Sequence, residues 1–237
     1  MPARRRKKRL SVGYGDLALS LLFIFPLFLA YHTGVAFTQS LNGVDFVTRV
    51  LLEVLEGNHE LYLAFQGGLG MAYAFILWLI WHEDRLPLQE WVPLVLESTI
   101  YALTLGSVIV LVMDPVFGLS ISEHSLSDVF QAVVISLGAG VYEELVFRLG
   151  IMGGLFLVLC KLDCSRAVAV GVSLLVSSVL FSFAHHLGAN GELFRVESFF
   201  YRIVAGAAFG LIFYFRSLAH AVYAHVFYDL YVFLLRA

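Results

Sequence analysis

The stretch GVYEELVFRLG, residues 140–150, places Glu143, Glu144 and Arg148 among neighbours that are mostly apolar. Each ionised side chain at the centre of a membrane span costs about 2.5–3.5 kcal/mol. Three of them together therefore need partners, water or neutralisation. If the surrounding chain is a membrane domain, this stretch predicts a polar site inside it.

The composition of the chain is that of an integral membrane protein. Of its 237 residues 60% are apolar, and the mean hydropathy of +0.85 is higher than a soluble domain needs. Seven segments have the roughly 20 residues that cross a bilayer. They are residues 17–37, 61–81, 91–113, 129–160, 167–186, 199–215 and 218–235. The sequence therefore predicts an all-α fold, a polytopic transmembrane helical bundle of about seven to eight helices with a polar intramembrane cavity.

The fourth segment, residues 129–160, is too long for one straight crossing. A bilayer core of roughly 30 Å needs about 20 residues at about 1.5 Å per residue. We expect this segment to be tilted, to be broken between residues 150 and 154, or to form two helices.

The basic charge is concentrated at the N-terminus. Residues 4–9 carry six of the fifteen basic side chains, and the other nine face eighteen acidic ones. A basic run can bind nucleic acid, but directly before a hydrophobic helix it is the usual signal for a cytoplasmic end. We therefore predict a basic cytoplasmic tail at 1–16, a single transmembrane domain at 17–237 and no nucleic-acid partner. The short loops and the basic start suit a bacterial inner membrane.

The connection between the first two spans has the pattern of an amphipathic helix. In NGVDFVTRVLLEVLEGNHE, residues 42–60, Val47, Val50 and Val54 share one helical face, and the charged residues lie mostly away from it. Such a helix rests on the membrane surface as a connector. A lid that gates access of a substrate is the alternative.

Helical spacing places two of the three charged residues in the opening stretch on one face and the third on another. Glu144 and Arg148 stand at i and i+4, which permits a charge-assisted pair. Glu143 lies about 100° round the helix from Glu144, so Arg148 does not easily satisfy both. We expect Glu143 to serve as a general base or acid. An ion pair that only holds the bundle together is the alternative.

Two later segments add polar groups at the same spacing. In FSFAHH, Phe181 precedes His185 by four residues, and in HVFYD, His225 precedes Asp229 by four. A lone histidine in an apolar helix is usually a packing residue, but polar groups on three helices favour a common site. Candidates of lower rank are His186, His220 and Glu97.

These groups fit hydrolysis of an acyl bond, with a peptide as the substrate. Glu143 and His185 could hold and deprotonate a water, and His225 with Asp229 could supply an oxyanion donor and its orienting partner. The serine-enzyme motif G-x-S-x-G is not found in the sequence. Spacing alone also allows a catalytic Zn²⁺ at Glu143, His185 and His225, although the motif H-E-x-x-H is missing.

The ordered motifs resemble those of a known family. They are E-E-x-x-x-R at Glu143, Glu144 and Arg148, F-x-x-x-H at Phe181 and His185, and H-x-x-x-D at His225 and Asp229. This set is similar to that of the CPBP family, the CAAX protease and bacteriocin-processing intramembrane proteases. The resemblance covers a motif-bearing core at 129–237, and the first three spans are compatible with it.

The resemblance implies a glutamate-dependent protease without a cofactor, although the family is often labelled metalloprotease. It implies Glu143 as the base, His185 as the residue that positions water, and Glu144 with Arg148 as organisers of the site. It assigns His225 and residue 229 to the oxyanion. Many members carry Asn where this chain has Asp229, which donates a hydrogen bond only when protonated and so is expected to orient His225.

The substrate class follows from the same resemblance. Relatives cleave prenylated C-terminal tails, or act in peptide maturation, in bacteriocin immunity or, as myxosortase-like enzymes, on C-terminally anchored surface proteins. The expected partners are the lipid bilayer and a membrane-embedded or lipid-anchored protein or peptide. The alternative is a non-catalytic membrane protein, either a proton or ion relay or an immunity or scaffold protein with the same polar cluster.

Overall fold

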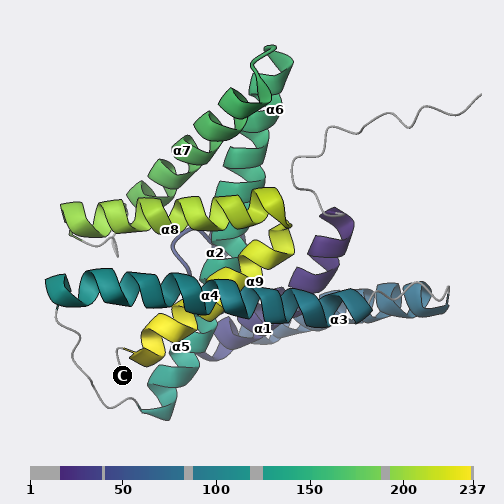
Figure 1. Cartoon of the computed structure of the whole chain (residues 1–237). Helices are drawn as coiled ribbons and strands as arrows, with labels where there is room; N and C mark the ends of the chain where they lie inside the picture. Colours follow the sequence, from purple (N-terminus) through teal and green to yellow (C-terminus); the bar gives the residue numbers. More distant parts are fainter. Residues whose placement is uncertain (1–16, 39–40, 83–87, 118–124, 188–192, 236–237) are drawn as a thin grey trace, which may run out of the picture.

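The computed structural model describes residues 17–38, 41–82, 88–117, 125–187 and 193–235 (Figure 1). Within these ranges the elements are α1 Leu17–Thr38, α2 Phe46–Val54, α3 His59–His82, α4 Leu88–Phe117, α5 Leu126–Gly138, η1 Ala139–Gly153, α6 Gly154–Lys161, α7 Arg166–Ala184, α8 Val196–Phe215 and α9 Leu218–Leu235. The predicted all-α, polytopic helical fold is confirmed. The predicted basic tail at 1–16 lies outside the described residues.

Five of these helices are long and apolar enough to cross a membrane. They are Leu17–Thr38, His59–Leu79, Gln89–Val108, Arg166–Ala184 and Val196–Phe215. The other two predicted segments form helix α9 and the continuous series α5, η1 and α6. The chain is therefore an integral membrane protein whose motif-bearing helices pack against one another.

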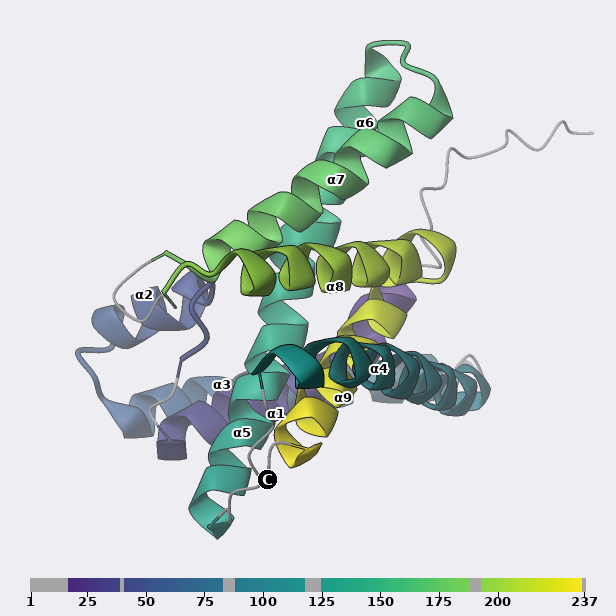
Figure 2. The same cartoon turned by 60° about the vertical axis from the view of Figure 1, so that its left-hand side comes forward.

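Helices α5, η1 and α6 form one uninterrupted rod, which runs from the lower to the upper end of the molecule in Figures 1 and 2. Its middle part, η1, is wound as a π-helix, and α-helical winding resumes at Gly154. Where the sequence allowed a break between residues 150 and 154, the helix instead continues and changes its winding. π-Helical turns are rare in proteins, and those that occur often lie at functional sites. The whole E-E-x-x-x-R motif lies on η1, which favours a functional site there.

Helix α2 is the amphipathic helix expected between the first two spans. The carboxylate of Asp45 caps it by accepting a hydrogen bond of 2.9 Å from the backbone N–H of Thr48. Val47, Val50 and Val54 are exposed on one side. An exposed apolar face is typical of a helix that lies in the membrane interface.

Glycines bring the motif helices close together. A Cβ on Gly140 would lie 2.9 Å from the carbonyl oxygen of Val222 and 3.1 Å from the backbone nitrogen of Val226, so only glycine lets η1 approach α9 this closely. A Cβ on Gly206 would lie 3.3 Å from the Cα of Ser178, where α8 meets α7. These close approaches hold η1, α7, α8 and α9 around a common site.

Candidate active site

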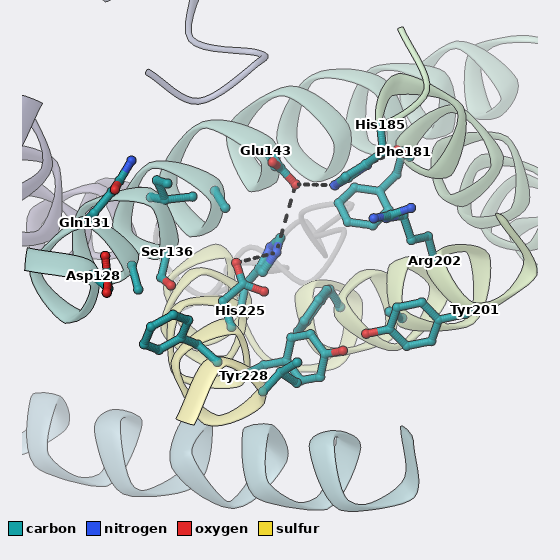
Figure 3. A pocket seen from close by; sticks show the side chains of 18 residues that line it. Asp128, Gln131, Ser136, Glu143, Phe181, His185, Tyr201, Arg202, His225 and Tyr228 are labelled. Carbon is teal, nitrogen blue, oxygen red and sulfur yellow. Dashed lines mark hydrogen bonds and ion pairs between the residues drawn. The ribbon is translucent and has the colours of Figure 1, made fainter. Parts of the chain in front are cut away.

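A cavity of about 520 Å³ lies where the motif helices converge, and Figure 3 shows it from close by. Its walls come from α5, η1, α7, α8 and α9. The lining residues with polar side chains are Asp128, Gln131, Ser136, Glu143, His185, Tyr201, Arg202, His225, Tyr228 and Asp229. Four of the six predicted site residues, namely Glu143, His185, His225 and Asp229, therefore face one space.

Glu143 lies at the meeting point of the three helices. Its Oε2 is 3.8 Å from Nε2 of His185 and 4.0 Å from Nε2 of His225, as the dashed lines in Figure 3 indicate. Both gaps exceed a direct hydrogen bond of about 2.7–3.2 Å. Among the described residues this buried Oε2 has no hydrogen-bond donor, whereas Oε1 accepts a bond from Asn42. One carboxylate oxygen is thus directed at the histidines and the other is already bound.

Glu144 and Arg148 form the predicted i, i+4 pair behind the cavity wall. Oε2 of Glu144 lies 3.2 Å from Nε of Arg148, and both side chains are fully buried. Oε1 of the same carboxylate lies 2.8 Å from Nδ1 of His225. Glu144 therefore joins the buried guanidinium to the imidazole that faces the cavity, and neither member of the pair lines the cavity itself.

The arginine is held on several sides. Its Nη2 donates a hydrogen bond of 3.1 Å to the carbonyl oxygen of Gly206 in α8. The guanidinium also lies 4.4 Å from the centre of the Phe181 ring, within the range of a cation–π contact. Arg148 thereby ties η1 to both α7 and α8.

His185 ends helix α7, and the F-x-x-x-H spacing fixes its ring. Nδ1 lies 2.9 Å from the carbonyl oxygen of Phe181. Because a carbonyl oxygen only accepts, Nδ1 carries the proton, and Nε2 is directed toward Glu143. The ring of Phe181 meets the imidazole edge to face, with 5.0 Å between the ring centres.

Neighbouring side chains hold one face and one nitrogen of the His225 ring. The ring of Phe209 stacks on it with a centre distance of 4.4 Å, and Glu144 holds Nδ1. Asp229 places Oδ2 at 3.7 Å from Nε2, which is too long for a direct hydrogen bond. Asp229 therefore lies beside His225 without a direct hydrogen bond to it.

The candidates of lower rank lie elsewhere. His186 packs against the rings of Phe194 and Phe199. Glu97 pairs with Arg216, and Nε2 of His220 lies 3.6 Å from the same carboxylate. Neither His186 nor the Glu97 cluster lines the cavity.

Two contributors to the site carry no signal in the sequence. Asn42 lies in the connection between α1 and α2, where its dipeptide with Gly43 predicts only a turn. Phe209 belongs to an apolar helix that holds several other phenylalanines, and nothing in the sequence distinguishes it from them. Only the tertiary structure brings both residues to the motif side chains.

The metal alternative remains a prediction. Within the described ranges, no group of three or more His, Cys, Asp or Glu side chains has an arrangement that could hold a metal ion. The nitrogen and oxygen atoms that a zinc ion would need are the same Nε2 and Oε2 atoms that face the cavity. Chelation is therefore the direct test.

A family model matches the motif-bearing part of the chain. Residues 125–231 match the family model for the type II CAAX prenyl endopeptidases described as Rce1-like. The matched range contains all three motifs, the whole of α5, η1, α7 and α8, and α9 as far as Tyr231. No curated protein and no solved structure matched the chain significantly.

Proposed function

We propose, on the premise that residues 125–231 are a CPBP domain of the Rce1-like type, that this integral membrane protein is an intramembrane endopeptidase. The observation that carries the proposal is the approach of Glu143 Oε2 to Nε2 of His185 and Nε2 of His225 inside one cavity. A carboxylate and two imidazoles around one open space are the groups that hydrolysis by an activated water requires.

The first step uses Glu143 and His185 to hold the attacking water. The 3.8 Å gap between Oε2 of Glu143 and Nε2 of His185 is spanned by one water that lies about 2.8 Å from each atom. Oε2 of Glu143 accepts the proton of this water as its oxygen attacks the carbonyl carbon of the scissile peptide. Nε2 of His185 accepts the second hydrogen bond of the water and so aligns it.

The second step breaks the peptide bond. The tetrahedral intermediate carries a negative oxygen, and His225 stabilises it as an imidazolium: Nδ1–H donates to Glu144, and Nε2–H donates to the oxygen where the charge develops. When the C–N bond breaks, the proton taken up by Glu143 passes to the leaving nitrogen. The products are a new carboxyl group and a new amine, and the carboxylate returns to its starting form.

The buried pair behind the cavity orients His225 for this role. Glu144 accepts a hydrogen bond from Nδ1–H, which directs Nε2 into the cavity, and Arg148 balances the charge of Glu144. We assign Asp229 to the electrostatic support of His225, since its 3.7 Å distance favours charge stabilisation over donation to an oxyanion.

The substrate class that fits is a membrane-anchored protein or peptide with an extended end. The cavity has a size usual for ligand pockets, about 300–1,000 Å³, and lies between helices that belong in a bilayer. A substrate therefore reaches it from the membrane, with lipid or an apolar anchor beside it. A bacterial inner membrane with the N-terminus in the cytoplasm remains our expected location.

The proposal is tested by comparing the membrane proteins of cells that contain the chain with those of cells that lack it. Mass spectrometry of protein termini should show at least one membrane protein that gains a new C-terminus only when the chain is present. The position of that terminus identifies the cleavage site. Identical termini in both samples would contradict the protease and favour the relay or the scaffold.

Removal of divalent metals should leave cleavage intact. The proposed step needs only a carboxylate and imidazoles, so kcat should change less than about twofold after exhaustive treatment with EDTA and 1,10-phenanthroline, unlike a zinc hydrolase. The metal content of the treated protein is measured by elemental analysis. A loss of activity that added Zn²⁺ restores would contradict the metal-free mechanism.

A further inference from the structure

We infer that Asn42 is a positioning residue for the general base, so that the N-terminal half of the chain completes the active site. The inference rests on the proposed function, because it concerns the carboxylate of Glu143. Asn42 lies outside residues 125–231, which contain all three motifs. It is separated from Glu143 by 101 positions in the sequence.

The contact is a direct one in a buried place. Nδ2 of Asn42 donates a hydrogen bond of 2.8 Å to Oε1 of Glu143, and Asn42 is only 8% exposed. The orientation of the amide is fixed independently, because its Oδ1 accepts a 3.0 Å bond from the backbone N–H of Val44. The group that faces the carboxylate is therefore the NH₂ donor.

The segment that carries Asn42 is itself anchored. The backbone N–H of Asn42 donates to the hydroxyl of Tyr31 in α1 at 3.1 Å, and that hydroxyl donates to Oδ2 of Asp45 at 2.8 Å. Asp45 in turn caps α2 through Thr48. Asn42 is thus held between the first span and the start of the interfacial helix, which makes its amide a fixed donor.

The amide of Asn42 binds one oxygen of the Glu143 carboxylate and leaves the other free to face the histidines. With Oε1 bound by Asn42, the rotation of the Glu143 carboxylate is restricted and Oε2 stays directed at His185 and His225. Asn42 does not line the cavity, so it does not meet the substrate. Loss of the amide should therefore lower kcat and leave KM nearly unchanged, which is the signature of positioning rather than binding.

The test uses the purified full chain in detergent and two probes. One is a peptide that spans the cut found in the membrane comparison, and the other is a farnesylated peptide with a CAAX-type end. Asn42→Ala should lower kcat about 10- to 100-fold, the range expected for one lost hydrogen bond to a charged group. The matched control is Asn58→Ala, which removes an exposed asparagine side chain whose one described hydrogen bond is accepted from the backbone N–H of Leu61. Its kcat should match the wild type.

The variant Asn42→Asp separates positioning from a general structural effect. The introduced carboxyl group donates to Glu143 only while it holds a proton, so the ratio of its activity to that of the wild type should rise as the pH is lowered. The same ratio for Asn42→Ala should stay flat. His185, His225 and Asp229 also face Glu143 or its neighbours and are present in every variant, so the ratio to the wild type reports the change made at position 42.

Each outcome has a definite meaning. If the wild type cleaves a probe and Asn42→Ala keeps its kcat, or changes KM instead, the inference is wrong and the proposed function stands. If the wild type cleaves neither probe, the proposed function fails, and the inference fails with it. A flat ratio for Asn42→Asp would likewise exclude a role through the donor.

Discussion

Glu143→Gln should lower kcat about 10²- to 10⁴-fold, the usual contribution of a general base. Glutamine has nearly the same shape as glutamate, and its side-chain oxygen still accepts the bond from Asn42. What the variant lacks is a basic oxygen between the two histidines, where the attacking water must lose its proton. Cleavage of the peptide from the membrane comparison, followed by mass spectrometry, measures the loss.

The control for this variant is a carboxylate outside the site. Glu197 is exposed in the first turn of α8 and does not line the cavity, so Glu197→Gln should keep the wild-type kcat. Both variants should insert into membranes and elute from size-exclusion chromatography like the wild type. If Glu143→Gln retained more than about a tenth of the wild-type kcat, the base in the mechanism would have to be another group.

The local part of this site was predictable because helix geometry is regular. The i, i+4 spacing predicted the pair of Glu144 and Arg148, which is present at 3.2 Å although η1 is wound as a π-helix. Glu143, one position earlier, faces the cavity instead. The same spacing explains how the carbonyl of Phe181 fixes His185. These interactions lie within one helix, where the sequence determines the relative position of side chains.

Contacts between distant segments were not predictable in the same way. The bond from Asn42 to Glu143 depends on how a turn after α1 is folded, and neither its position nor its residue type distinguishes it from an ordinary loop asparagine. The link from Glu144 to His225 depends on the approach of η1 to α9 at Gly140. The sequence left open whether residues 129–160 form one helix or two, because an apolar pattern alone does not distinguish a change of winding from a break.

Replacing the buried arginine should have the largest effect on stability. Arg148→Met replaces the arginine with an apolar side chain of similar length. It leaves Glu144 as a buried carboxylate with only His225 beside it. Breaking a buried pair in this way costs about 3–5 kcal/mol. The bond to Gly206 and the contact with the Phe181 ring are lost as well. Denaturant titration of the protein in mixed micelles measures the free energy of unfolding.

A second variant identifies the cause of that loss. If the uncompensated charge of Glu144 dominates, adding Glu144→Gln to Arg148→Met should recover roughly half of the lost stability, because no buried ion then remains in the pair. The surface control Arg49→Met, on the exposed side of α2, should stay within about 0.5 kcal/mol of the wild type. If the double variant were as unstable as Arg148→Met alone, the arginine would stabilise the fold through its contacts with α7 and α8 rather than by neutralising Glu144.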